Sequence, residues 1–282
     1  MNTVSTKSYN KYTRVNRLDI FDNLRKFHQY IKCHYLNKYF KGGIIIDVGS
    51  SNLKSLRFWI NLQNVRHIYS LEPSKELYDI GYKTCMRNEF SRNNVTCIRA
   101  TGEDNWSDGS AAFNTSSTNK LINMKNNKAD LITFEFSFHY LVNNIDMVIN
   151  NIKNFSKSGT KIIIHTLNGD LIKERLRDQN KFIVYRDDEE VFYLEKLYNN
   201  EDQLKKINVY FKGVTGLDNI IPEHIVEQDY LYEKFSNDSF DLTEYSEFPN
   251  NFNDDYILEQ HEIDISSLYV TYVFTLKKNY II

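Results

Sequence analysis

The stretch IIIDVGSSN, residues 44–52, gives the first indication of the fold of this 282-residue chain. Three isoleucines followed by Asp47 and small residues predict a buried strand that runs into a tight turn. Gly49, Ser50 and Ser51 make up this turn, and small side chains there let a backbone approach a bound ligand closely. The stretch therefore predicts the first strand of an α/β fold, with a turn that faces a ligand.

Strand and helix patterns alternate from this stretch in both directions. Strands are expected within 42–51, 66–73, 94–100, 129–136 and 157–167, with helices at 19–36, 53–62, 74–90, 144–155 and 168–176. Beyond Arg177 the patterns predict antiparallel strands at 181–185, 191–198 and 206–213, a helix at 222–235 and a closing strand at 266–278. Residues 102–128 lack periodicity and predict a long surface loop. The order predicts an α/β class with a mainly parallel sheet and an antiparallel C-terminal addition.

The composition excludes several classes of protein. No run approaches the roughly 20 apolar residues that a membrane helix needs, and residues 1–17 lack the apolar segment of a signal peptide. The three scattered cysteines do not match a zinc or disulfide pattern, which favours a reduced intracellular protein. Residues 1–15 are expected to form a flexible basic arm.

The charge is divided unevenly along the chain. Residues 1–186 hold 28 Lys and Arg against 16 Asp and Glu, whereas residues 187–264 hold 5 against 21. The basic first part favours a polyanionic ligand, with nucleic acid as the leading candidate. The alternative explanation is that the basic and acidic parts of the chain neutralise each other within the fold.

Glu72 ends the second predicted strand, 25 residues beyond Asp47. An acid at this place can accept two hydrogen bonds from a ribose diol, so the first turn and Glu72 together predict an adenosine-containing cofactor. The chain contains neither the G-x-G-x-x-G pattern nor a phosphate-binding P-loop, which argues against dinucleotides and nucleoside triphosphates. S-adenosylmethionine carries no phosphate and needs fewer glycines. An ordinary strand-to-helix turn with a surface glutamate is the alternative.

A second group of polar residues ends the strand predicted at 129–136. The stretch FEFSFHYL, residues 134–141, places Glu135, His139 and Tyr140 close together at the edge where ligands bind in doubly wound sheets. An aromatic ring there could stack on a base. A histidine at a strand end is also commonly structural, and that reading stays open on the spacing alone.

Several motifs occur in a recognisable order: FDNLRK, DVGSS, LEPSKEL, FEFSFHY, IIIHTLNGDLI, IIPEHIVEQD and SLYVTYVF. In this order they resemble the mRNA cap guanine-N7 methyltransferases, in particular the C-terminal methyltransferase domain of capping enzymes from large cytoplasmic DNA viruses of the poxvirus and asfarvirus type. The resemblance covers about residues 16–278. It implies a class I S-adenosylmethionine-dependent fold in one domain, residues 16–282, that forms part of a longer capping enzyme.

The resemblance also assigns roles to individual residues. The cofactor, S-adenosylmethionine, which leaves as S-adenosylhomocysteine, is expected to contact Lys26, Asp47, Gly49, Ser50, Ser51, Glu72, Pro73, Thr101, Gly102, Glu103, Glu135, Phe136 and Tyr140. The cap guanine is expected to contact Asn23, His139, Tyr140, Glu223 and Tyr269, among which His139, Tyr140 and Glu223 serve the methyl transfer. No metal is expected.

Three positions depart from the family pattern. The second glycine of the first turn is Ser51, and the usual glutamine before the His-Tyr pair is Glu135, which places a carboxylate near a cationic sulfonium. The acid that usually holds the adenine amino group falls near Thr101, so that Glu103, Asp104 or a backbone carbonyl is expected to replace it.

The implied reaction needs no general base, because guanine N7 carries an in-plane lone pair and no proton. Catalysis then rests on bringing N7 in line with the methyl group and the sulfur. A carboxylate such as Glu223 can accept from N1–H and the exocyclic amine of guanine, and His139 can donate to O6. For Glu223 the alternative is a helix N-terminal position after Pro222, where the helix dipole favours an acid.

The resemblance implies partners and a location as well. The partners are the capped 5′ end of mRNA, upstream triphosphatase and guanylyltransferase domains of the same polypeptide, and a stimulatory subunit; no membrane is involved. The location is the host cytoplasm, at the viral factory or packaged in the virion. Two alternatives remain: a class I methyltransferase for another RNA or a small molecule, and a degenerate methyltransferase fold that binds RNA or stimulates a partner.

Overall fold

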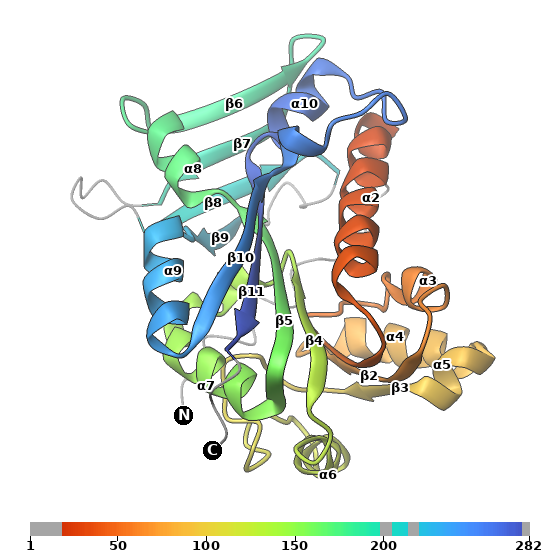
Figure 1. Cartoon of the computed structure of the whole chain (residues 1–282). Helices are drawn as coiled ribbons and strands as arrows, with labels where there is room; N and C mark the ends of the chain where they lie inside the picture. The colour runs from red at the N-terminus through yellow and green to blue at the C-terminus, as the bar shows by residue number, and fades with distance from the viewer. Residues whose placement is uncertain (1–18, 198–204, 214–219, 278–282) are drawn as a thin grey trace.

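The computed structural model describes residues 19–197, 205–213 and 220–277, and its centre is a seven-stranded sheet. The strand order is β10-β11-β5-β4-β1-β2-β3, and β11 runs antiparallel to both of its neighbours while the other adjacent pairs are parallel. The strands are β1 (Gly43–Val48), β2 (Val65–Leu71), β3 (Val95–Ile98), β4 (Ala129–Glu135), β5 (Ser156–Leu167), β10 (Phe240–Glu247) and β11 (Tyr269–Leu276). The predicted α/β class with a mainly parallel sheet is confirmed (Figure 1).

Both faces of this sheet are covered, because its strands are apolar on both sides. In β1, Ile45 packs into one core and Ile44 and Ile46 pack into the other. The first core includes residues of α2 (Asp22–Tyr39), α3 (Leu56–Trp59), α4 (Lys75–Arg87) and α8 (Gly169–Arg175). The second includes residues of α6 (Thr115–Met124), α7 (Ile145–Phe155) and α9 (Gln228–Asn237). A short helix, α5 (Glu89–Asn94), leads into β3.

A second, four-stranded antiparallel sheet forms the C-terminal addition that the sequence predicts. Its order is β6-β7-β8-β9, from β6 (Lys181–Arg186), β7 (Glu189–Lys196), β8 (Lys206–Phe211) and β9 (Ile221–His224). Figure 1 shows it above the end of the main sheet where β5 finishes. One of its faces packs into the first core through Phe192, Leu194, Ile207 and Val209. This position brings β9 over the carboxyl ends of the parallel strands.

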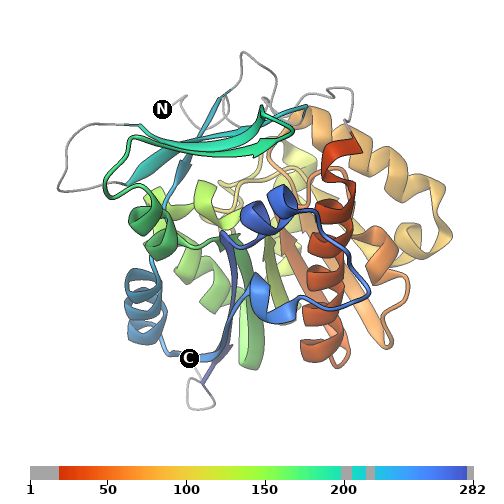
Figure 2. The same ribbon diagram turned by 90° about the horizontal axis from the view of Figure 1, so that it is seen from above.

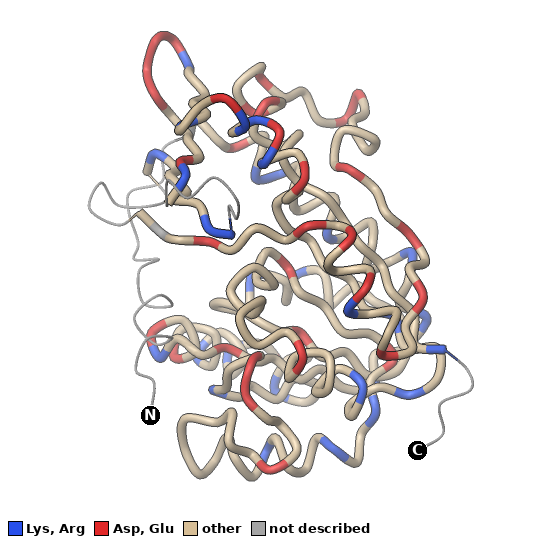
Figure 3. Tube along the Cα trace, turned by 90° about the vertical axis from the view of Figure 1, so that its left-hand side faces the viewer, with Lys and Arg blue, Asp and Glu red and all other residues tan. Residues whose placement is uncertain are grey.

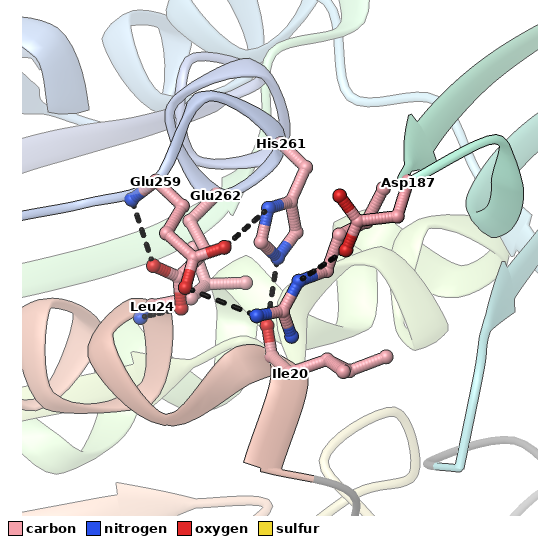
Figure 4. A network of polar contacts seen from close by, with 7 residues as sticks. Ile20, Leu24, Asp187, Glu259, His261 and Glu262 are labelled. Carbon is pink, nitrogen blue, oxygen red and sulfur yellow. Dashed lines mark hydrogen bonds and ion pairs between the residues drawn. The ribbon is translucent and has the colours of Figure 1, made fainter.

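Helix α2 is positioned by α10 (Gln260–Ser266), a helix far away in the sequence. Glu262 accepts a hydrogen bond from the Leu24 backbone N–H at 2.8 Å, and His261 Nε2 donates to the Ile20 carbonyl at 2.7 Å. Figure 4 shows this network, and Figure 2 shows α2 beside the C-terminal segment that carries η4 (Phe248–Asn251) and α10. The first backbone N–H groups of a helix lack partners within the helix, so Glu262 caps α2 from outside.

Two predictions about local structure are wrong. Glu223 lies in strand β9, not in the helix expected at 222–235; that helix begins only at Gln228. Pro222 is accommodated because β9 is an edge strand, whose outer side needs no N–H donor. The expected loop 102–128 contains helix α6 and buries Trp106 completely. In addition, β10, α5 and α10 were not expected.

The uneven charge along the chain is partly neutralised inside the fold. Several ion pairs join the basic part to the acidic part: Lys38–Glu244, Lys153–Asp238, Lys173–Glu227, Lys181–Glu190 and Arg186–Glu259. Figure 3 shows both signs of charge over the molecule, with acidic residues at the β6–β7 hairpin at the top of the view. The expected basic arm, residues 1–15, lies outside the described residues. In the part of the chain that is described, no helix is both long and apolar enough to cross a membrane.

Candidate functional site

The turn after β1 adopts the tight conformation that its small residues predict. Gly49 has φ +78°, and a Cβ added to it would lie 2.4 Å from the Ser137 Cβ. The N–H groups of Gly49 and Ser50 both donate to the Leu71 carbonyl. Ser51, at the position of the missing glycine, takes a left-handed conformation with φ 54° and donates its N–H to Glu72. The turn therefore keeps a left-handed residue at this point without the second glycine.

Glu72 is buried at the end of β2 and fastened to the turn. Its Oε2 accepts from the Ser51 N–H at 2.7 Å and its Oε1 accepts from the Ser74 N–H at 2.8 Å. Burial raises the pKa of Glu72 to about 7, although these two N–H donors act to lower it. Each carboxylate oxygen has two lone pairs, so Glu72 retains the capacity to accept from a ligand. The neighbouring Pro73 is buried as well.

Asp47 and Glu135 lie on adjacent strands and form an acidic centre. Asp47 is 2% exposed and accepts from the Thr133 hydroxyl at 2.7 Å. Burial raises the pKa of Asp47 to about 8, with a further contribution from the Glu135 carboxylate. Glu135 accepts from the Ser55 hydroxyl at 2.5 Å and pairs with the Lys32 ammonium at 3.0 Å. With Glu72 nearby, the centre holds more carboxylates than cations.

The cation of this centre comes from α2 but is not Lys26, the lysine of this helix that the resemblance assigns to the cofactor. Lys26 is exposed and lies on another face of the helix, whereas Lys32 reaches Glu135. Asn23, expected on the cap side, is half-buried. The apolar spacing of α2 carried the missed signal, because Lys32 follows the buried Ile31 and borders the buried face.

An aromatic cluster stands next to the acidic centre. The His28 ring stacks on Phe136 with centroids 5.3 Å apart, and Tyr269 meets His28 at 4.9 Å and Phe136 at 5.4 Å. Phe136 has φ 58°, a strained value for a residue with a side chain and one that concentrates at functional sites. Lys32 Nζ lies 5.0 Å from the Phe136 ring centroid. The expected residues Phe136 and Tyr269 are therefore in contact, and His28 is an unexpected member of their cluster.

His139 and Tyr140 lie in η2 (Phe138–Tyr140), a short 3-10 helix after β4, and meet Glu223 of β9 in the second sheet. His139 Nε2 lies 3.5 Å from Glu223 Oε2, and the Tyr140 hydroxyl donates to Glu223 Oε1 at 3.4 Å. His139 is 5% exposed, and neither of its ring nitrogens has a hydrogen-bond partner among the described residues. Burial, followed by the nearby His224, lowers the pKa of His139 to about 3. Its ring is therefore neutral near pH 7, with one donor and one acceptor unused.

The loop after β3 contains the three candidates for the acceptor of the adenine amino group: Glu103, Asp104 and a backbone carbonyl. The Thr101 hydroxyl donates to Asp104 at 2.8 Å, and the Thr101 carbonyl accepts from the Trp106 indole at 3.0 Å. Glu103 is half-buried, and its carboxylate accepts no hydrogen bond within the described chain; burial, then Asp104, raises its pKa. A Cβ on Gly102 would lie 2.8 Å from Leu141, which fixes this loop against the strand ends. Of the three acceptors, Glu103 has the most unused capacity.

The arrangement suits binding and orientation more than bond making by the protein itself. Buried carboxylates surround the first turn, and a neutral imidazole, a phenol and a carboxylate converge beside it. Within the described ranges, no group of three or more His, Cys, Asp or Glu side chains could hold a metal ion. The site can therefore hold a cation at one end and read the edge of a planar polar ring at the other.

Known structures share this fold. No family model matches the chain. An S-adenosylmethionine-dependent methyltransferase from Listeria monocytogenes aligns at 11% identity over 90% of this chain and 99% of its own, with a TM-score of 0.58. The methyltransferase CcbJ from Streptomyces caelestis aligns at 10% identity over 96% and 98%, also with 0.58. A third, from Clostridium acetobutylicum, aligns at 14% identity over 91% and 92%, with 0.53. The chain has the fold of S-adenosylmethionine-dependent methyltransferases.

Proposed function

We propose that this chain is an mRNA cap guanine-N7 methyltransferase that uses S-adenosylmethionine. The observation that carries the proposal is the convergence of Glu223 from β9 with His139 and Tyr140 after β4. The second sheet thereby adds an acceptor to the carboxyl edge of the main sheet, where ligands bind in this type of fold. The residues involved are those that the family resemblance assigns to the guanine.

The cofactor residues of the proposal fit a cationic ribonucleoside. S-adenosylmethionine, when bound, supplies a methyl group activated by a sulfonium. Asp47, Glu72 and Glu135 provide three carboxylates against the single ammonium of Lys32, a balance that favours a positively charged ligand. Glu72 has lone pairs left for a ribose diol, and Glu103 has them for an adenine amino group.

The protein residues assigned to the cap guanine provide hydrogen-bonding groups that complement its edge. The Glu223 carboxylate accepts from N1–H and the exocyclic amine of guanine, a pair of donors that adenine lacks. His139 is neutral, and because its ring nitrogens make no hydrogen bond among the described residues, it has an N–H available for O6. Loss of such a buried charged partner typically costs about 2–5 kcal/mol. The aromatic rings of Phe136 and Tyr269 border the same edge.

The chain's residues act by positioning in this proposal. Guanine N7 needs no deprotonation, so a neutral His139 with a pKa of about 3 suits a hydrogen-bonding role better than that of a general base. Tyr140 and Glu223 restrain each other through their hydrogen bond, which limits the orientations open to a bound ring. Capped RNA, upstream capping domains, a stimulatory subunit and the host cytoplasm remain parts of the proposal.

The test measures transfer of a labelled methyl group from S-adenosylmethionine to GpppA- and GpppG-capped RNA. Wild type, Glu223→Ala and the exposed control Glu76→Gln are compared, with uncapped and ApppG-capped RNA as substrates that lack the cap guanine. We expect methylation that maps to N7, survives in the control and falls by at least about thirtyfold in Glu223→Ala, the ratio that corresponds to 2 kcal/mol.

Other results would redirect the proposal. Equal transfer to uncapped RNA would indicate a methyltransferase for another RNA site. Cofactor binding by calorimetry without any transfer would indicate dependence on a partner or a stimulatory role. Absence of cofactor binding would refute the enzyme and leave a binding module.

A further inference from the structure

The ion pair between α2 and β4 is buried more deeply than the other Lys and Arg pairs of the described residues. Lys32 Nζ lies 3.0 Å from Glu135 Oε2, and neither side chain is more than 17% exposed. Each of the other Lys or Arg pairs includes a side chain that is at least 33% exposed. Taking two charges out of water costs free energy that their mutual attraction often fails to offset. The stability of the fold alone therefore does not explain this pair.

Glu135 and its neighbour Asp47 each keep one carboxylate oxygen without a hydrogen bond. Lys32 and the Ser55 hydroxyl both reach Oε2 of Glu135, and no hydrogen bond to its Oε1 forms within the described ranges. Asp47, on the adjacent strand β1, accepts from the Thr133 hydroxyl through Oδ1, and its Oδ2 accepts no hydrogen bond from that part of the chain either. Buried carboxylates are normally hydrogen-bonded. Two acceptor atoms are thus available to a group from outside the chain.

The charges of this ion pair act on the candidate cofactor site. Burial, followed by the Glu135 carboxylate, raises the pKa of Asp47, whereas the Lys32 ammonium acts to lower it. Asp47 and Glu135 lie at the carboxyl edge of the main sheet, where ligands bind in this type of fold, and Lys32 reaches that edge from α2. Charges in such buried surroundings are weakly screened. A change in the charge of Lys32 or Glu135 therefore acts on a ligand bound at this edge.

The methyl donor and the product differ in charge. S-adenosylmethionine carries a sulfonium and S-adenosylhomocysteine a neutral thioether, so the two ligands differ by one methyl group and one unit of positive charge. A protein discriminates between two ligands only through interactions that differ between them. The electrostatic interaction of the site with the sulfonium is such an interaction, and its sign depends on the charges that surround the ligand.

We propose that the Lys32–Glu135 pair sets the preference of the cofactor site for the cationic methyl donor over the neutral product. Glu135 attracts the sulfonium and Lys32 repels it, so the two side chains change the same preference in opposite directions. With both present, these effects largely cancel, and the buried carboxylates of Asp47 and Glu72 provide the remaining negative charge. The inference rests on the use of S-adenosylmethionine, but it does not depend on the cap as the methyl acceptor.

The test is calorimetric titration of the full chain with S-adenosylmethionine, S-adenosylhomocysteine and sinefungin, at one pH and ionic strength and without RNA. Sinefungin carries a cationic amine in place of the reactive methyl group and has no sulfonium, so it separates the effect of charge from that of the methyl group. The variants are Lys32→Met, Glu135→Gln and the double variant. Lys38→Met and Glu244→Gln are the matched controls, because they remove the same charges from an ion pair about 9 Å further along α2.

The measured preference is the dissociation constant of the product divided by that of the donor. We expect Glu135→Gln to lower this preference about tenfold and Lys32→Met to raise it about tenfold, while the double variant returns close to the wild type. A unit charge about 10 Å from the sulfonium has an effect of this size at an effective dielectric constant of about 20. Sinefungin should follow the donor, and the control variants should stay within about twofold of the wild type, because their charges are more exposed and better screened.

The proposal is overturned if neither single variant changes the preference, or if the control variants change it equally. Glu135→Gln keeps the test decisive if Lys32→Met does not fold, because glutamine has nearly the same shape as glutamate and Lys32 keeps some contact with solvent. Failure of the folded wild type to bind any of the three ligands would overturn both this proposal and the use of the cofactor. Because the titrations contain no RNA, a failure of cap methylation alone does not affect their result.

Discussion

Lys32 and Glu135 form an ion pair at 3.0 Å that joins α2 to the last residue of β4. Both side chains are largely buried, with exposed fractions of 17% and 6%. The same Glu135 oxygen also accepts from the Ser55 hydroxyl. The resemblance places a glutamine at the position of Glu135. The ion pair explains how a glutamate is tolerated there, since Lys32 neutralises its carboxylate.

Lys32→Met should destabilise the fold by about 3 kcal/mol, because it leaves the Glu135 carboxylate buried without its ion-pair partner. Adding Glu135→Gln should recover much of this loss, since no charge then remains unpaired. Urea unfolding of wild type, both single variants and the double variant measures the coupling. If the losses of unfolding free energy were strictly additive, Lys32 and Glu135 would not stabilise each other.

Glu262→Ala should cost about 1–2 kcal/mol of unfolding free energy. Its carboxylate accepts from the Leu24 N–H at 2.8 Å and the Glu259 N–H at 3.0 Å, so its loss leaves one N–H group at the start of each of two helices without its acceptor. Gln260→Ala on the exposed side of α10 is the matched control, and should change stability little. Denaturant titration of both variants gives the comparison; equal losses would mean that the cap is dispensable.

Gly49→Ala and Gly159→Ala form a second matched pair. Both glycines have positive φ, +78° and +83°, but a Cβ at Gly49 meets Ser137 at 2.4 Å while one at Gly159 meets nothing within 4 Å. Gly159→Ala should therefore cost only backbone strain, about 1 kcal/mol. Gly49→Ala adds overpacking and should reach about 3 kcal/mol. If both variants lost similar amounts of unfolding free energy, the close packing of Gly49 against Ser137 would be contradicted.

Stability should fall as the pH rises toward 8. In the folded chain the pKa of Glu72 is raised to about 7 and that of Asp47 to about 8, so the folded state binds more protons than the unfolded state above about pH 4. The stabilising contribution of these groups is complete below their unfolded pKa and is lost as the pH passes through 7 and 8. Melting temperatures between pH 7 and 8.5 measure the slope, which Glu72→Gln should reduce. At lower pH the buried His28, His139 and His165, whose pKa values are lowered to about 3, act in the opposite direction.

Binding of the cofactor should deprotonate Asp47 and Glu72. A cationic cofactor favours the ionised forms of Asp47 and Glu72, so its binding should release protons near pH 7 and become tighter as the pH rises to 8. Calorimetry of S-adenosylmethionine in buffers of different ionisation enthalpy counts the protons. Proton uptake on binding would contradict the assignment of these two acids.

The strand-end residues could be placed from the sequence because parallel strands direct their carboxyl ends to one edge. Asp47, Gly49, Glu72 and Glu135 lie at the ends of three different strands, and the structure brings them together there. Their roles toward a ligand stay predictions. Lys32 was missed because a motif match to Lys26 took precedence over the apolar spacing of α2.

Glu223 lies in a segment whose secondary structure was predicted wrongly from the sequence. Its segment, with Pro222 followed by acidic residues, has the local signals of a helix start, yet pairing with β8 makes it a strand. Tertiary pairing overrides such local preferences because an edge strand gains hydrogen bonds along its inner side. Trp106 was placed in a surface loop for a similar reason, since its contacts are distant in the sequence. Its N–H donates to Asn151 of α7, 45 residues away, and its ring packs on Phe155.

Local patterns were enough to predict the alternation of strands and helices, the tight turn after Asp47 and the edge at which the polar strand ends gather, because short-range periodicity and turn chemistry encode these. The contact of Glu223 with His139 and that of Lys32 with Glu135 became known only from the packed fold. These pairs come from distant segments, and their meeting depends on how whole elements pack, which no local pattern specifies.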